Sequence, residues 1–212
     1  MKIYHTILFT FLICCQSPVM AYSQINSPKE ALQLLMEGNE RFVNDKSHNA
    51  DRNQDRRAAI SAKQKPFAVV LGCSDSRVPP ELAFDQGLGD IFTVRVAGNV
   101  VGATELESVA YSAIYNGSAI IMVLGHENCG AVAAVLAHTT QDIPAIAKLI
   151  KPAVNTKNDT MSAAVKANVY KNVMRIKQSP SIAKLIKAGK VDVVGALYDL
   201  DTGKVQLLPE QE

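Results

Sequence analysis

Two short segments of this 212-residue chain combine the residue types that bind and activate a metal ion. Residues 73–77 read CSDSR, and residues 126–130 read HENCG. An apolar run typical of a buried β-strand comes just before each segment, at residues 67–71 and 120–124. Because strands of one sheet end at a common edge, the pattern predicts that two cysteines and one histidine meet there.

The predicted ligands are Cys73, His126 and Cys129. Two thiolates and one imidazole are the protein ligands of a catalytic zinc site whose fourth tetrahedral position stays open. Cys129 also precedes Gly130 at an expected helix start, where the helix dipole favours a thiolate. We therefore predict one zinc ion per chain. The alternative is a disulfide between the two cysteines, which would give no reason for the histidine beside them.

An aspartate and an arginine follow the first cysteine at two-residue steps. Asp75 can accept a hydrogen bond from a water molecule at the open zinc position and so orient a lone pair toward a substrate. Arg77 can hold Asp75 ionised through a charge-assisted, bidentate pair. An Asp-x-Arg pair in isolation is more often a surface salt bridge, but here it directly follows a predicted zinc ligand. We predict that Asp75 and Arg77 act together in catalysis.

The elements that must position these residues alternate between strand and helix. Strand patterns cover residues 67–72, 91–96, 119–124 and 191–198, and a turn leads to a last short strand at 204–207. Helical patterns cover residues 28–42, a short stretch through Ile60, and residues 104–115, 129–137 and 162–178. Capping boxes are predicted at residues 27–30 and 104–107, and a surface loop at 152–159. This order predicts an α/β fold with a central, mostly parallel β-sheet flanked by helices and an N-terminal helical extension.

The first 23 residues have the pattern of a signal peptide. A positive end at Met1 and Lys2 precedes an apolar stretch at residues 6–15, which is too short to span a membrane in the mature protein. Residues 21–23, Ala-Tyr-Ser, form a small-x-small cleavage site. We predict a signal peptide at 1–23, cleavage before Gln24, a mature domain at 24–212 and a periplasmic or secreted location. A retained membrane anchor is the alternative.

Composition and cysteine spacing bound the function further. The chain is 48% apolar and 20% charged with a net charge of +2, which describes a globular domain without the basic footprint of a nucleic-acid-binding protein. We therefore expect no nucleic-acid partner and, after signal cleavage, no stable membrane insertion. Cleavage also removes Cys14 and Cys15, so only the two motif cysteines remain, and they lack the C-x-x-C spacing of a redox dithiol.

The pattern C-x-D-x-R followed by H-x-x-C, each after an apolar strand, resembles the β-class carbonic anhydrases. The resemblance runs from about Leu32 to about Leu208 and includes residues 65–72, 78–81, 95–99 and 194–199. It implies that the chain interconverts carbon dioxide and bicarbonate, with zinc as its cofactor. Hydrolysis of CS₂ or COS on the same scaffold is one alternative. An inactive zinc protein, in which Asp75 closes the site as fourth ligand, is another.

The family also implies a substrate pocket and an assembly. Its pocket residues match Gln64, Phe92 and Tyr111, and Val78 and Gly130 are further expected walls. The resemblance implies a homodimer or homotetramer in which N-terminal helices pack across a neighbouring subunit and a partner chain completes the pocket. The apolar residues of the first helix, Leu32, Leu35 and Phe42, could equally cover their own sheet. Bicarbonate-regulated members use a tryptophan in a separate pocket, and this chain has none.

Overall fold

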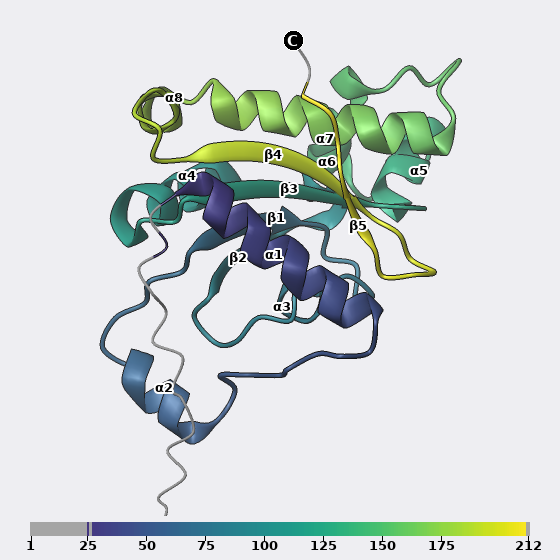
Figure 1. Ribbon diagram of the computed structural model, residues 1–212. Coiled ribbons are helices and arrows are strands. Elements are labelled where there is room, and N and C mark those ends of the chain that lie inside the picture. Colours follow the sequence, from purple (N-terminus) through teal and green to yellow (C-terminus); the bar gives the residue numbers. More distant parts are fainter. Residues whose placement is uncertain (1–24, 26, 211–212) are drawn as a thin grey trace, which may run out of the picture.

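The computed structural model of the protein describes residue 25 and residues 27–210 (Figure 1). Within them, one five-stranded sheet has the order β2-β1-β3-β4-β5. The strands are β1 (Ala68–Gly72), β2 (Ile91–Arg95), β3 (Ile120–His126), β4 (Asp192–Tyr198) and β5 (Val205–Leu207). The first four are parallel and β5 runs antiparallel to β4, which confirms the predicted central, mostly parallel sheet. The predicted signal peptide at 1–23 lies outside the described residues.

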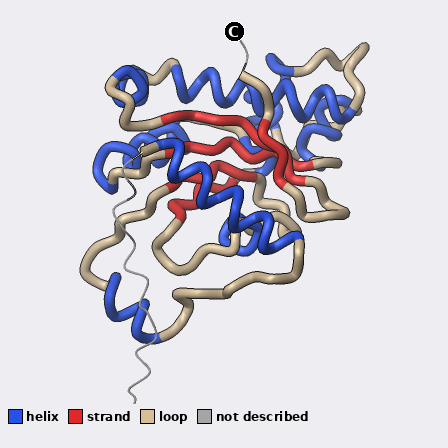
Figure 2. The backbone as a smooth tube through the Cα atoms, in the orientation of Figure 1, coloured by secondary structure: helices blue, strands red, loops and turns tan. Residues whose placement is uncertain are grey.

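The helices connect and cover these strands (Figure 2). They are α1 (Pro28–Val43), α2 (Gln54–Ile60), α3 (Pro80–Ala83), α4 (Ala103–Tyr111), α5 (Gly130–Leu136), α6 (Pro144–Ile150), α7 (Met161–Lys177) and α8 (Pro180–Lys187). The sequence pattern missed α3, α6 and α8. Each of these three helices begins at a proline, which suits the first helical position and was the available signal. In the described part of the chain, no helix is both long and apolar enough to cross a membrane.

Alternating side chains of the strands face two separate apolar layers. On one face, Val70, Met122 and Ala196 pack with Ala31 and Leu35 of α1. On the other face, the neighbouring strand positions pack against α4, α7 and α8; the buried residues there include Val69, Ile121, Val193, Val109, Val169 and Ile182. Figure 1 shows α1 crossing the first face while α7 lies along the opposite one. The sheet is therefore covered on both sides, as parallel sheets require.

The first helix covers the sheet of its own chain. Leu35 is fully buried, and Leu32 and Phe42 are half-buried against the same core. Ser27 caps the helix by accepting a hydrogen bond from the Glu30 N–H at 3.2 Å, as the sequence predicted. These residues therefore pack against the sheet of their own chain. The short helix α2, in contrast, contains no buried residue.

The predicted capping box at residues 104–107 is wrong. The helix α4 begins one residue earlier, at Ala103, with Gly102 as its N-cap. Glu105 accepts a hydrogen bond from the Gly102 N–H at 2.9 Å, so this carboxylate, not that of Glu107, satisfies the helix start. The helix then passes into a π-helical turn at Ser112–Asn116, within the stretch predicted as one helix.

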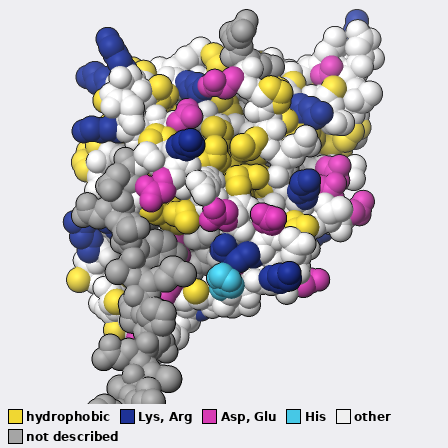
Figure 3. Space-filling model, in the orientation of Figure 1, with side chains coloured by type: hydrophobic (Ala, Val, Ile, Leu, Met, Phe, Trp, Pro, Cys, Tyr) yellow, Lys and Arg dark blue, Asp and Glu magenta, His cyan; other side chains and the backbone are white. Residues whose placement is uncertain are grey.

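Charged groups of both signs are interspersed over the face of the molecule shown in Figure 3, and the net charge of the chain is +2.

Candidate metal centre

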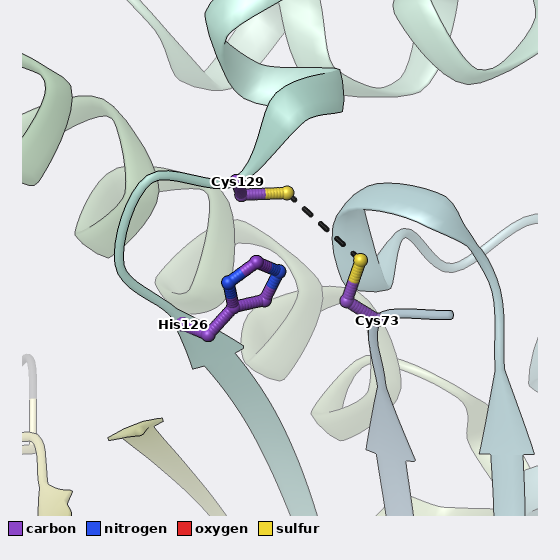
Figure 4. Close-up of side chains that lie close together, drawn as sticks. All are labelled: Cys73, His126 and Cys129. Carbon is purple, nitrogen blue, oxygen red and sulfur yellow. Dashed lines mark hydrogen bonds between the residues drawn. The ribbon is translucent and has the colours of Figure 1, made fainter. Parts of the chain in front are cut away.

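The three predicted metal ligands meet at the carboxyl end of β1 and β3. Cys73 directly follows β1, His126 is the last residue of β3, and Cys129 is the N-cap residue of α5. All three are buried, and their candidate ligand atoms lie within 4.8 Å of one another. Figure 4 shows the imidazole and both sulfur atoms directed toward a common point between the two loops. The sequence prediction that strand ends bring these residues together is confirmed.

The geometry of the cluster fits zinc and excludes a disulfide. The two sulfur atoms are 4.0 Å apart, whereas a disulfide bond is about 2.05 Å long. In a tetrahedral site with Zn–S bonds of about 2.3 Å, the sulfurs lie about 3.8 Å apart. The sulfurs are therefore already spaced as zinc requires, and two thiolates with one imidazole leave a fourth position open.

The imidazole of His126 is oriented to use Nε2 as a ligand. Its Nδ1 lies 2.7 Å from the carbonyl oxygen of Glu127, an acceptor that favours the tautomer with the proton on Nδ1. Nε2 is buried and makes no hydrogen bond of normal geometry to any described residue. A buried nitrogen without such a partner is costly unless it has another ligand, and a metal ion supplies one.

Without metal, the pKa values of the two cysteine thiols shift in opposite directions. The hydrogen bond from Cys129 lowers the pKa of the Cys73 thiol. The same interaction, together with burial, raises the pKa of Cys129 and outweighs the favourable N–H groups of Ala131 and Val132. The start of α5 thus favours a thiolate at Cys129 as expected, but in the metal-free protein the interaction with Cys73 and burial outweigh this contribution. A divalent cation would favour the thiolate at both positions.

Asp75 and Arg77 form a bidentate pair beside the cluster. Arg77 Nε donates to Asp75 Oδ1 at 2.9 Å, and Nη2 donates to Oδ2 at 2.7 Å. The Arg77 N–H adds a third hydrogen bond to Oδ1 at 3.0 Å. These contacts hold the pKa of Asp75 well below its ordinary value. Asp75 Oδ2 also lies 3.8 Å from His126 Nε2, so an ionised carboxylate borders the predicted ligands.

Two residues that the sequence analysis did not connect with the site, Arg95 and Gly98, hold the loop around Cys73. Arg95 at the end of β2 donates to the carbonyl oxygens of Cys73 and Asp75, at 2.9 and 2.5 Å. The Gly98 N–H donates to the Cys73 sulfur at 3.3 Å. Both residues belong to the 95–99 segment that contributed to the family resemblance, but no sequence pattern connects them with Cys73.

The predicted pocket residues Gln64, Phe92 and Tyr111 lie away from the cluster. Phe92 pairs with Val69 of β1. Cys73, just beyond the end of β1, comes four residues after Val69, which is about 13 Å at the usual rise of a strand. Tyr111 packs beside Phe92 with a ring separation of 6.3 Å and remains 49% exposed. Gln64 is exposed in the segment before β1. One chain thus does not bring these three residues to its own ligands.

The two other predicted pocket residues lie in different surroundings. Val78 is 1% exposed and belongs to the apolar core beneath α1. Gly130 is exposed beside Cys129, and a Cβ atom placed on it would meet no other group within 4 Å. Gly130 therefore leaves open space next to a predicted ligand, whereas Val78 packs inward.

Comparison with known proteins identifies what the chain resembles. The family model described as carbonic anhydrase matches residues 68–205. Carbonic anhydrase 2 of Mycobacterium tuberculosis is 37% identical over 192 residues, which cover 85% of this chain and 93% of that protein.

Solved structures agree with this sequence similarity. The β-carbonic anhydrase of Coccomyxa in complex with acetazolamide superposes with a TM-score of 0.64 at 25% identity, covering 84% of this chain and 86% of that one. A structure from a study of two tetrameric β-carbonic anhydrases of Sordaria macrospora has the same fold, with a TM-score of 0.59 at 20% identity and coverage of 84% and 97%.

Proposed function

This chain belongs to the β-class carbonic anhydrases, and on that premise we propose that it binds one zinc ion and catalyses the reversible hydration of carbon dioxide to bicarbonate. Cys73, His126 and Cys129 would hold the zinc ion. The observation that carries the proposal is the buried Cys-His-Cys cluster, whose ligand atoms lie within 4.8 Å of one another and beside an ionised Asp75.

Zinc, when bound, would lower the pKa of water and supply a nucleophile near neutral pH. The other steps fall to the side chains of this chain. Asp75, held ionised by Arg77, has only acceptor atoms, so Oδ2 accepts a hydrogen bond from the attacking water and turns its lone pair toward the substrate. Asp75 Oδ2 lies 3.8 Å from His126 Nε2, one of the proposed ligand atoms, which supports this role. Carbon dioxide is uncharged, so its pocket needs apolar walls close to this point.

We further propose that those walls come from a second copy of the chain, in a homodimer or homotetramer. Around Tyr111, the exposed apolar residues Ile114 and Tyr115 extend the surface, at 44% and 71% exposure. Isolated exposed apolar residues are common, but a contiguous aromatic patch favours an interface. The tetrameric Sordaria enzymes have the same fold, which is compatible with such an assembly. In it, Gln64, Phe92 and Tyr111 of one chain would face the zinc ligands of its partner.

The N-terminal pattern supports export as part of the proposal. Residues 1–23 would direct the chain to a periplasmic or extracellular location and be removed before Gln24. Fractionation of producing cells, with N-terminal sequencing of the exported protein, tests this. A cell-bound protein that retains Met1 would contradict it.

Two alternatives use the same zinc ligands. CS₂ or COS hydrolysis would need the same nucleophile, so only relative rates separate it from carbon dioxide hydration. An inactive form would need Asp75 to leave Arg77 and bind zinc as a fourth ligand. The three hydrogen bonds between Arg77 and Asp75 favour the open arrangement.

The decisive experiment measures metal content and rate together. For mature protein, we expect one zinc per chain and carbon dioxide hydration that is faster than hydrolysis of CS₂ or COS. A chelator-treated sample, assayed before and after zinc is restored, is the matched control. A fully zinc-loaded protein without carbon dioxide hydration across pH 6 to 9 would refute the proposed function, and faster CS₂ hydrolysis would favour the first alternative.

A further inference from the structure

The sulfur of Cys73 accepts a hydrogen bond from a backbone group whose position is unusual. The donor is the N–H of Gly98, at 3.3 Å, in the short 3₁₀ turn Ala97–Asn99 that follows β2. Gly98 is buried and has a φ of +75°. A Cβ atom there would lie 2.9 Å from Ile150 Cδ1 and 3.2 Å from Ala131 Cβ. Only glycine therefore fits this left-handed conformation and close packing.

An asparagine on a distant helix holds this glycine. Asn168 of α7 is fully buried, and its Nδ2 donates to the Gly98 carbonyl oxygen at 2.8 Å. One helical turn later, Asn172 is also buried and donates from Nδ2 to Asn168 Oδ1 at 3.2 Å. Because Asn168 Oδ1 is the acceptor in that contact, its NH₂ group must face Gly98. Asn172 Oδ1 in turn accepts from the Val101 N–H at 2.9 Å.

Two asparagines one helical turn apart, Asn168 and Asn172, are unexpected on the buried apolar face of α7. Their neighbours Val165, Val169 and Val173 pack in the apolar layers against the sheet and α5. A buried amide is destabilising when unpaired, and even when paired it contributes less than a well-packed apolar side chain. The hydrogen bonds of these two asparagines therefore fix the backbone of residues 98–101, which includes the Gly98 N–H that contacts Cys73.

A hydrogen bond to a thiolate withdraws electron density from its sulfur. The sulfur then donates less to a bound metal, and such outer contacts tune metal affinity and reactivity. We propose that Asn168 is a positioning residue: by holding Gly98, it directs the Gly98 N–H at Cys73 and so sets how strongly this sulfur donates to zinc. The inference rests on the proposed zinc site. Asn172 orients Asn168, and neither asparagine touches the reacting atoms.

Cobalt(II) substitution provides a direct readout of sulfur donation. We expect Asn168→Ala to move the sulfur-to-cobalt charge-transfer band to longer wavelength, because the Cys73 sulfur loses the hydrogen bond that withdraws its electron density. Asn168→Leu keeps the branched arrangement of side-chain heavy atoms but removes the polar groups, so it provides a second variant without a cavity, and the same band shift is expected.

The matched control is Asn39→Ala. Asn39 is equally buried and donates to the Ala83 and Gly203 carbonyl oxygens at 2.9 Å, but it does not contact the loops of the metal centre. Its removal should lower the denaturant midpoint at least as much as Asn168→Ala and leave the charge-transfer band in place.

The outcomes separate this inference from the proposed function. A parent protein that binds cobalt and hydrates carbon dioxide, together with unshifted bands in both Asn168 variants, would overturn the positioning role alone. An equal shift in Asn39→Ala would also overturn it, because general loosening would then explain the effect. A parent that binds no cobalt or zinc would overturn both proposals.

Discussion

The carboxyl end of the sheet and the surface around α4 differ in how complete they are within one chain. At the carboxyl end, Cys73, His126 and Cys129 are buried together, and backbone groups fix their orientation. At α4, Tyr111 and Tyr115 are ordered against one another but exposed to solvent. A single chain thus brings its proposed zinc ligands together, whereas its proposed substrate-pocket residues lie apart from them. The predictions below test this division.

The largest effect is expected from Cys129→Ala. Removing one of three ligands should abolish stoichiometric zinc binding and activity together, because the remaining thiolate and imidazole cannot hold zinc tightly. Metal analysis and carbon dioxide hydration on the same sample provide the measurement. The α4 surface is untouched, so the oligomeric state should not change. A zinc-loaded, active variant would show that the ligand assignment is wrong.

A smaller loss is expected from Asp75→Asn. The amide keeps the shape of the side chain, but its NH₂ group is a donor where an acceptor is needed, so the turnover rate should fall on the order of 10²-fold. Zinc content should stay at one per chain. Asp201→Asn, in the exposed turn before β5, is a control that should leave the rate unchanged. Equal rates for parent and Asp75→Asn would leave Asp75 as a mere salt-bridge partner of Arg77.

The proposed substrate-pocket role of the α4 surface is tested by Tyr111→Ala. This variant should keep zinc and lose about 10-fold in rate, a moderate loss for a substrate-positioning contact. Co-production with excess Cys129→Ala chains then separates the two arrangements. If Tyr111 acts on the partner's metal centre, mixed oligomers should recover nearly the parental rate per zinc ion. An unchanged rate after mixing would mean that Tyr111 acts within its own chain or not at all.

A fall in pH is expected to have the smallest effect on the rate, provided that zinc is in excess. In the metal-free protein, burial disfavours a charged His126, but the nearby Cys73 sulfur outweighs this and raises the pKa of the imidazole above its ordinary value. Zinc needs a thiolate at Cys129, whose pKa is also raised, and a neutral ring at His126, so below the raised pKa of the imidazole the zinc affinity should fall more steeply, by about a further 10-fold per pH unit. Titration of zinc binding between pH 5 and 8 measures this. An affinity that is constant over that range would contradict it.

Much of the metal centre could be predicted because its information is local. Each ligand lies at or just beyond the end of an apolar strand, and parallel strands end at one edge, so sequence position fixed spatial position. The same reasoning could not find Asn168, which lies 70 residues from Gly98 and meets it only because α7 packs across the sheet. A pair of asparagines one turn apart on an apolar helix face was the available signal.

The sequence by itself determined the alternation of strands and helices, the mostly parallel sheet and the proposed ligand set, because these follow from apolar periodicity and residue chemistry. Only the tertiary structure decided three other features. It buried α1 on its own sheet, since the apolar stripe of a helix does not specify which surface it covers. It paired Phe92 with Val69, away from the end of β1 that leads to Cys73, since register depends on the neighbouring strand. It joined Asn168 to Gly98, because a buried amide takes whichever partner the packing brings within reach.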